Sequence, residues 1–397
     1  MSDADLFAKC DSPRVQEYRT AGEMGVLPYF REMASQPGPV VVHAGKEVVM
    51  LGSNNYLGLT ADERVKRAAT EAVERYGSGC TGSRLMNGTL PIHTELESEL
   101  CDWLGGEACL VFTAGYLVNL GVLSTLVGPG DAVFLDTGCH ASLLDGAQMS
   151  RGKMVPFKHN SSASLRRRLS AWRADDGGGA LVCVEGLYSM EGDVPSLAEF
   201  AAASAEFGAR LMIDEAHALG VLGPDGAGRA AEEGVRPDLL MGTFSKSLAS
   251  CGGFLIAPPD VIDYLRVLCR PFLFTAASVP AAIAAALEAL RVCRKEGWRR
   301  DALAERAAQL HRGLTELGYP VGAPSPGAII PVHVSDDWKA ARLWRALLDE
   351  GVYTNCALPP AVPRGRALLR TSVMATHTPE HIDRALRAFE VARSTLD

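Results

Sequence analysis

The sequence lacks the features of several common functional classes. Its 397 residues carry a formal net charge of −8, whereas nucleic acids and anionic membranes are bound by basic patches. Its ten cysteines are scattered and form no Cys-x-x-Cys pair, which argues against a zinc site or a disulfide framework. We therefore expect a reduced, cytoplasmic protein with no nucleic-acid partner and no metal.

The usual marks of a secreted or membrane protein are also missing. Residues 1–11 contain acids and no apolar core, so we expect no secretory signal. Residues 108–130 carry no charge, but polar residues, glycines and a proline interrupt them, and a bilayer disfavours such interruptions. We expect a buried strand over 108–112, a glycine turn and then a buried helix, and no integral membrane segment.

The chain does contain a series of short apolar runs that end in polar residues. Residues 131–136, 181–185, 211–214 and 239–243 follow this pattern, with helical segments between them. The alternation predicts an α/β fold with a mostly parallel central sheet and helices on both faces.

Beyond the sheet, the pattern suggests three parts. Residues 1–50 form an N-terminal arm with a helical stretch over 15–31 and a hairpin over 40–50, and residues 51–290 form the large domain. Residues 279–299 read as one long helix, and short strands and helices follow. We assign residues 291–397 to a small C-terminal α+β domain.

Two of the strand ends carry the most informative chemistry. Asp214 ends one apolar run, with His217 three residues later, and Lys246 follows the end of another, 32 residues after Asp214. Ligands bind beyond the carboxyl ends of strands in such sheets. A lysine facing a buried carboxylate suits pyridoxal 5′-phosphate (PLP), which a lysine amine binds as a Schiff base while the carboxylate keeps the ring nitrogen protonated.

Other residues at the same predicted edge support a site. A strand, residues 113–116 and a helix follow in that order, which places backbone N–H groups where a phosphate can bind. His140 also follows a strand end. Arg370 lies within an apolar strand, and a buried guanidinium needs an anion, either in an internal ion pair or as the carboxylate of a substrate.

The glycine-rich segment 77–82 matches G-x-G-x-x-G. A dinucleotide-binding fingerprint requires a strand before this motif and a helix after it. Here a helical pattern precedes the motif and loop residues follow, so we reject that reading and retain a loop that substrate can approach.

Taken together, several stretches resemble the α-oxoamine synthases, PLP-dependent enzymes of the aspartate-aminotransferase fold (fold type I). The resemblance covers about residues 50–395 and is closest to the bacterial serine palmitoyltransferases. It rests on YGSGCTGSRLMNGT, DAVFLDTGCHASLLDG, EGLYSMEGD, DEAHALGVLGPDGAG, GTFSKSLASCGGF, CRPFLFTAASVP and LPPAVPRGRALLRTSVMATHT.

The resemblance implies a role for each matching residue. Lys246 would bind PLP and later remove the substrate's α-proton, Asp214 would pair with the ring nitrogen, and His217 would bond the ring's phenolic oxygen. His140 would stack on the ring and touch the substrate carboxylate. Further cofactor contacts would come from Gly115, Tyr116, Glu185, Ser189, Thr243 and Ser245. Thr275 would contact the cofactor phosphate from the partner subunit. The amino acid would be bound by Arg370, Asn54 and Ser83.

The implied reaction is a decarboxylative Claisen condensation of a small L-amino acid, with serine favoured, and a fatty acyl thioester. It yields an α-amino ketone resembling 3-ketosphinganine, CO2 and a free thiol, in a homodimer with interfacial sites. Two residues depart from the family pattern: Ala114 replaces a common serine, and Asn54 replaces a tyrosine. Glycine or alanine with another coenzyme A or carrier-protein thioester, as in 8-amino-7-oxononanoate or secondary-metabolite synthases, therefore stays open.

Other classes fit the residues less well. Residues 214–217 read DEAH, as in nucleotide-hydrolysing helicases, but those need a G-x-x-x-x-G-K-[ST] loop, which this sequence lacks. A non-catalytic subunit of the same family would lack Lys246. An aminotransferase of the same fold stays an alternative, against which only the resemblance argues.

Overall fold

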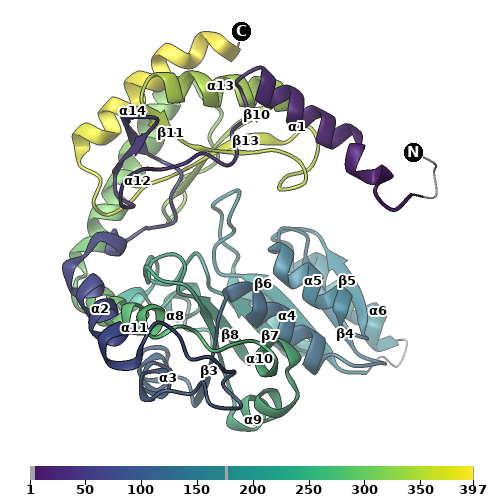
Figure 1. The fold of residues 1–397 in the computed structure, drawn as a ribbon. Coiled ribbons are helices and arrows are strands. Elements are labelled where there is room, and N and C mark those ends of the chain that lie inside the picture. Colours follow the sequence, from purple (N-terminus) through teal and green to yellow (C-terminus); the bar gives the residue numbers. More distant parts are fainter. Residues whose placement is uncertain (1–4, 175–177, 397) are drawn as a thin grey trace.

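The computed structural model describes residues 5–174 and 178–396. Figure 1 shows them as a larger lobe built around the labelled strands β3 to β8, and a smaller lobe that contains both ends of the described chain. Residues 1–4, the first part of the segment 1–11 in which we expect no secretory signal, are not among the described residues. Within it, no helix is both long and apolar enough to cross a membrane.

The larger lobe is organised around a seven-stranded sheet in the order β3-β9-β8-β7-β6-β4-β5. Its strands are β3 (Ala108–Phe112), β4 (Ala132–Asp136), β5 (Lys153–Phe157), β6 (Ala180–Glu185), β7 (Arg210–Asp214), β8 (Leu239–Thr243) and β9 (Gly253–Ala257). Strands β4 to β8 pair in parallel, and β9 runs antiparallel to both of its neighbours. The mostly parallel sheet expected from the sequence is confirmed, although β5 was not predicted.

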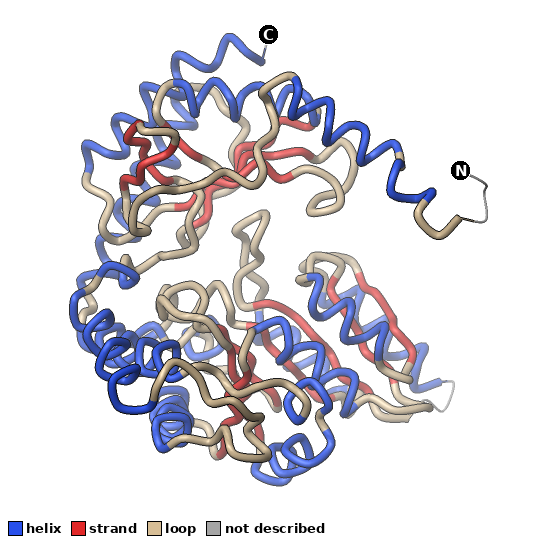
Figure 2. The backbone as a smooth tube through the Cα atoms, in the orientation of Figure 1, coloured by secondary structure: helices blue, strands red, loops and turns tan. Residues whose placement is uncertain are grey.

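Helices cover both faces of this sheet (Figure 2), because successive residues of a strand point to opposite sides. In β4, Val133 and Leu135 pack with α4 (Gly115–Leu126) and α5 (Ala141–Met149). Phe134 of the same strand packs on the other face. The helices on that face include α6 (Ser162–Ala174), α7 (Leu197–Glu206) and α8 (Arg229–Glu232).

A further group of helices covers the face occupied by α6, α7 and α8, at the end of the sheet formed by β3, β9 and β8. It comprises α2 (Glu63–Tyr76), α3 (Pro91–Leu104) and α11 (Pro280–Lys295). The strand over 108–112 and the buried helix after it are confirmed as β3 and α4. The glycine-rich segment 77–82 follows helix α2 and contains no strand, as our rejection of a dinucleotide site requires. The short helices α9 (Pro259–Leu268) and α10 (Arg270–Leu273) complete this lobe.

The single long helix predicted over residues 279–299 is wrong. Helix α11 ends at Lys295, Glu296 leaves helical geometry, and α12 (Trp298–Glu316) begins after Gly297. The physical reason is that the two helices belong to different cores: α11 packs in the larger lobe and α12 in the smaller one. Helical periodicity in the sequence does not show that the two halves of this segment pack in different cores.

The smaller lobe contains two three-stranded sheets. One has the order β10-β13-β12, from Ile329–Ser335, Ala367–Ser372 and Asn355–Ala357. The other has the order β1-β2-β11, from Val40–His43, Lys46–Met50 and Val352–Tyr353. The predicted hairpin over 40–50 is thus confirmed, and its valines share a core with α13 (Asp337–Asp349) and α14 (Pro379–Ala392). Helix α1 (Pro13–Glu23) ends earlier than predicted and buries no residue.

Substitutions of one buried and one exposed tryptophan test the packing of the smaller lobe. Trp344 is fully buried, and its indole N–H donates to the Thr354 carbonyl at 3.1 Å. We expect Trp344→Ala to lower the free energy of unfolding by about 3–5 kcal/mol, because it leaves a cavity. Trp298 is 53% exposed, so Trp298→Ala should cost less than about 1 kcal/mol. Equal losses for the two variants in chemical denaturation would contradict this packing.

Candidate active site

Register within the central sheet brings the predicted polar residues to one edge. Glu185 pairs with Asp214 across β6 and β7, and Asp214 pairs with Met241 across β7 and β8. Thr243 ends β8 two residues after Met241, and Lys246 follows in the next turn. The residues that the sequence placed beyond separate strand ends therefore lie together.

Asp214 is the buried carboxylate of this edge, with only 3% of its surface exposed. One oxygen accepts from Asn119 Nδ2 at 2.8 Å, and the other accepts from the Ala216 main-chain N–H at 3.0 Å. Asn119 Nδ2 also donates to Ser142 Oγ at 2.9 Å. These donors are neutral, so they orient the carboxylate without cancelling its charge.

Lys246 shares an electrostatic environment with this carboxylate. Burial lowers the pKa of the Lys246 amine, Asp214 and Glu185 oppose that effect, and Arg370 adds to it. A lowered pKa increases the neutral fraction of the amine near pH 7, and the neutral amine is the form that attacks an aldehyde or accepts a proton.

His217 and Tyr56 form a second buried pair beside Lys246. Tyr56 Oη lies 2.7 Å from His217 Nδ1, and Tyr56 also donates to Asn54 Oδ1 at 3.1 Å. Burial, Lys246 and Arg370 lower the pKa of His217 well below its ordinary value, so its ring is neutral at pH 7. Tyr56 is a residue of this site that was not predicted from the sequence.

His140 begins helix α5 as its N-cap residue. Its main-chain N–H donates to the Glu185 carboxyl group, and its Nδ1 lies 2.8 Å from Ser142 Oγ. The pKa of His140 is lowered by burial and by Lys246, although Asp214 acts in the opposite direction. Burial and Asp214 raise the pKa of Glu185 well above its ordinary value, which favours the protonated acid.

The start of helix α4 forms an anion cradle with the end of β8. Ala114, the N-cap residue, makes no side-chain capping bond, so the first backbone N–H groups of the helix stay available to a ligand. Gly115 packs so closely that a Cβ there would lie 2.9 Å from Thr243 Oγ1. Thr243 Oγ1 in turn lies 2.9 Å from Ser245 Oγ. Helix N–H groups and hydroxyls on one spot suit a phosphate.

Tyr116 is predicted to touch the cofactor and lies at the mouth of this cradle. It is 40% exposed, and its ring meets His140 edge-on, with the ring centroids 6.2 Å apart. Its hydroxyl donates to Asp145. The side chain therefore borders the site between His140 and the start of α4.

These features fit PLP. The pKa of the lysine is lowered, no cationic side chain among the described residues bonds to the buried Asp214 carboxylate, and a Cβ at Gly115 would crowd the cradle formed with Thr243. PLP brings an aldehyde, a pyridine nitrogen and a phosphate, and each finds a chemically matched group. Lys246, Asp214 and the residues around Gly115 would hold these three parts.

Arg370 lies next to this constellation in strand β13 and is 4% exposed. Its Nε donates to the Ser189 carbonyl oxygen, and its Nη2 donates to Tyr56 Oη at 3.1 Å. Among the described residues no carboxylate forms an ion pair with it, so the internal ion pair that the sequence left open is not seen. A buried guanidinium with neutral partners keeps its charge available for an anionic ligand.

Ser83 and Thr275 are not joined to this set by any contact within one described chain. Ser83 forms a β-bridge with Ala276, and Thr275 lines a small cleft with Arg84 and Thr113. Both predicted residues therefore lie on adjoining loops, and among the described residues neither forms a hydrogen bond with Lys246, Asp214 or Arg370.

A cavity of about 380 Å³ opens at the opposite edge of the same sheet. It is lined by the beginnings of β4, β6, β7 and β8, and none of the predicted site residues borders it. Ligands of open α/β sheets bind at the carboxyl edge of the strands, so we assign the chemistry to the Asp214 edge and not to this cavity.

Comparison with known proteins identifies similar chains. A family model described as aminotransferase class I and II matches residues 46–389. The serine palmitoyltransferase of Caulobacter vibrioides is 44% identical over 375 residues, covering 94% of this chain and 92% of that one. A putative 8-amino-7-oxononanoate synthase of Desulforudis audaxviator is 43% identical, covering 87% of this chain and 89% of that one.

Solved structures give the same picture. A serine palmitoyltransferase from S. paucimobilis, with a bound PLP–myriocin adduct, matches with a TM-score of 0.95 and 39% identity, covering 98% of this chain and 99% of that one. The Sphingomonas wittichii serine palmitoyltransferase matches with a TM-score of 0.94 and 40% identity, covering 99% of each chain.

The environment of Lys246 generates a testable pH dependence. In the cofactor-free protein, its amine should titrate below the ordinary lysine pKa of 10.5, because burial disfavours the charged form. Competitive acylation across a pH series, read by peptide mass spectrometry, measures that pKa. Because Asp214 raises the pKa of Lys246, Asp214→Asn should lower it further. A higher Lys246 pKa in the variant would contradict the proximity of the two groups.

Proposed function

The chain belongs to the aminotransferase class I and II family and, within it, to the α-oxoamine synthases, and we propose that it condenses L-serine with a fatty acyl thioester. The products are CO2, a free thiol and an α-amino ketone resembling 3-ketosphinganine, an intermediate of lipid biosynthesis. The observation that carries this proposal is the half-buried Lys246 side chain, whose pKa is lowered by burial although the buried Asp214 carboxylate opposes that effect.

The cofactor is PLP, which the S. paucimobilis relative binds. When bound, PLP supplies an electron sink that stabilises a carbanion at the α-carbon of the amino acid. Asp214 would hold a proton on the pyridine nitrogen, and its neutral donors Asn119 and Ala216 leave its negative charge intact for that purpose. His217, kept neutral, would hydrogen bond to the phenolic oxygen.

Lys246 would act as the general base. Its lowered pKa increases the fraction of neutral amine, and the neutral amine can take the α-proton at Nζ. The α-carbon would then form a bond to the thioester carbonyl carbon as the carbon–sulfur bond breaks and the thiolate leaves. When the carboxylate later departs as CO2, the proton held at Lys246 Nζ would return to the α-carbon. The lysine therefore serves first to bind the cofactor and then to move a proton.

Arg370 and His140 would hold the carboxylate of the amino acid. Arg370 has neutral partners, so its charge can pair with a substrate carboxylate until that group departs as CO2. His140 borders the same space through its contacts with Glu185 and Ser142. Two further residues are predicted to contact the substrate. Asn54 is linked to this site by its hydrogen bond with Tyr56. Ser83 would reach the site of the other subunit in a dimer.

A second substrate pair stays in consideration because of two observations. The chain is also 43% identical to a putative 8-amino-7-oxononanoate synthase, and the resemblance to the palmitoyltransferases implies a tyrosine where this chain has Asn54. Glycine or alanine with another coenzyme A or carrier-protein thioester would use the same Lys246, Asp214 and Arg370.

We further propose that the enzyme works as a homodimer. Thr275 of the partner subunit would reach the phosphate cradle, as the family resemblance implies, and within one described chain no hydrogen bond joins Thr275 to the cradle. Large apolar side chains beside these loops support an interface, because Phe274 is 72% exposed and Met86 is 76% exposed. The cytoplasmic location expected from the scattered cysteines stays a prediction.

Replacing the lysine tests the proposed chemistry. Lys246→Ala should abolish turnover and the visible absorbance of the lysine-bound cofactor, because the amine that binds PLP and moves the proton is gone. Lys158→Ala, which removes an exposed lysine, should leave both unchanged. Turnover retained by Lys246→Ala would defeat the assignment.

A substrate panel distinguishes the two candidate reactions. The purified protein is incubated with serine, alanine or glycine and with acyl thioesters of different chain length and carrier, and the amino ketones are identified by mass spectrometry. We expect serine and a long-chain thioester to give the largest product signal. Failure of all three amino acids to exchange their α-proton would contradict the proposed function.

A further inference from the structure

The loop that follows β6 connects the two lobes beside the active site. Figures 1 and 2 show it rising from the sheet toward the smaller lobe. Two bonds close its turn: the Tyr188 N–H donates to the Asp193 carbonyl at 3.0 Å, and the Gly192 N–H donates to the Tyr188 carbonyl at 3.0 Å. We call residues 186–194 the bridging loop.

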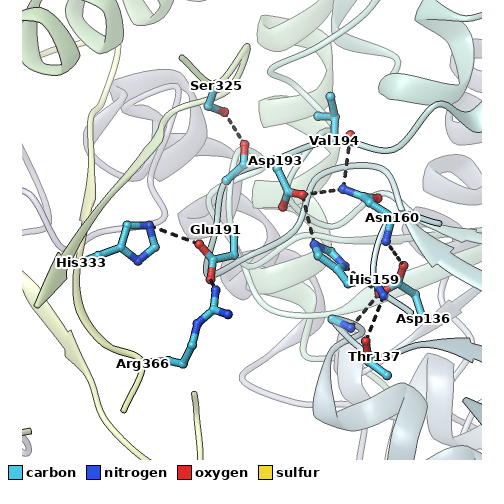
Figure 3. Close-up of polar contacts among 12 residues, drawn as sticks. Asp136, Thr137, His159, Asn160, Glu191, Asp193, Val194, Ser325, His333 and Arg366 are labelled. Carbon is cyan, nitrogen blue, oxygen red and sulfur yellow. Dashed lines mark hydrogen bonds and ion pairs between the residues drawn. The ribbon is translucent and has the colours of Figure 1, made fainter. Parts of the chain in front are cut away.

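The base of the bridging loop is fixed by a histidine between two carboxylates (Figure 3). His159 Nδ1 lies 2.7 Å from Asp136 Oδ1, and its Nε2 lies 3.0 Å from Asp193 Oδ2. An imidazole that meets an ionised carboxylate at each nitrogen must carry both protons. Asn160 adds a main-chain bond to Asp136 at 2.8 Å and a side-chain bond to Asp193.

The charge of His159 makes this link strong over a wide pH range. Burial alone would lower the pKa of His159, but the bonds to Asp136 and Asp193 outweigh burial and raise it to about 10. The contribution of this protonation to folding is complete below the ordinary value of 6.5 and is lost as the pH rises through about 10. Asp136 is fully buried at the end of β4, so it is a rigid anchor.

The tip of the bridging loop is held by the smaller lobe. Glu191 pairs with Arg366 at 3.2 Å and approaches His333 Nε2 at 3.4 Å, and Ser325 donates to the Gly192 carbonyl (Figure 3). Leu187 of the loop packs into the core of the smaller lobe. The loop therefore belongs to one lobe at its base and to the other at its tip.

Between base and tip, the bridging loop touches the substrate-binding arginine. The Ser189 carbonyl oxygen accepts from Arg370 Nε, while Arg370 Nη2 donates to Tyr56. These two neutral acceptors fix the plane of the guanidinium. A displacement of Ser189 would therefore turn the face that Arg370 offers to a carboxylate.

We propose that His159 and Asp193 are positioning residues that set the orientation of Arg370 through the bridging loop, and thereby set the affinity for the amino-acid carboxylate. The inference rests on the proposed function for the identity of that ligand. The route is continuous: Asp136 anchors His159, His159 holds Asp193, and the turn closed by Asp193 and Tyr188 places Ser189 against Arg370. Neither His159 nor Asp193 touches the reacting atoms.

Steady-state kinetics of Asp193→Asn and His159→Gln test the positioning role. Each variant removes the charge-assisted bond between the two side chains, so the KM for serine should rise about tenfold, an effect typical of losing one well-oriented contact. The kcat should fall less than about threefold, because Lys246 and Asp214 keep their own contacts. The double variant should be no worse than about the worse single one, since both lose the same bond.

Asp238→Asn serves as the matched control. Asp238 accepts from Arg210 at 2.6 Å and from the Leu211 N–H at 2.8 Å, at the opposite edge of the same sheet. The Asp238→Asn substitution removes an anchoring carboxylate of the same kind but leaves the bridging loop intact. Its KM for serine should match that of the wild type even where its Tm falls. If Asp193→Asn and Asp238→Asn lower Tm alike and leave KM equally unchanged, the role of the loop is structural only and the proposal is overturned.

Hydrogen–deuterium exchange decides the question independently of turnover. In Asp193→Asn, amides of residues 188–192 and of 368–371 should exchange faster than in the wild type, whereas Asp238→Asn should not change them. Unchanged exchange in Asp193→Asn overturns the proposal. A wild-type protein that turns over none of the amino acids would defeat the proposed function instead, and the exchange comparison would still decide whether the loop controls Arg370.

Discussion

The site depends on one electrostatic constraint, the burial of the Asp214 carboxylate beside the Lys246 amine. Burying a carboxylate is costly unless donors or a cation compensate for lost water. Here the bonded donors, Asn119 and Ala216, are neutral, so the carboxylate keeps its charge beside a lysine whose pKa is lowered by burial. A protonated pyridine nitrogen supplies the missing cation, and an aldehyde supplies a partner for the amine, which is why PLP fits both groups at once.

The division of labour between the lobes follows from the same constraint. The larger lobe carries the residues proposed to hold the cofactor on parallel strand ends, where register fixes Glu185, Asp214 and Thr243 relative to one another. The smaller lobe contributes Arg370 from β13. Contacts through Tyr56 and the bridging loop join these parts, so the orientation of the Arg370 guanidinium depends on how the lobes are held together.

Much of this could be predicted from the sequence because the main residues follow strand ends. Asp214, His217 and Lys246 stand directly after apolar runs, and parallel strands bring such positions to one edge. Asn119, Ser142 and Tyr56 were missed, since they lie within helices or a loop and acquire meaning only through contacts distant in the chain. The break between α11 and α12 and the shared core of the N-terminal hairpin were hidden for the same reason, because local periodicity does not reveal tertiary partners.

The most direct test of the account is to find where the cofactor attaches. The purified protein is incubated with PLP, reduced with sodium borohydride and digested, and the modified peptides are located by mass spectrometry. The account predicts that the phosphopyridoxyl group lies on Lys246, with other lysines modified only at trace level. Modification spread over exposed lysines, with Lys246 unmodified, would contradict the claim that this amine and Asp214 share the cofactor site.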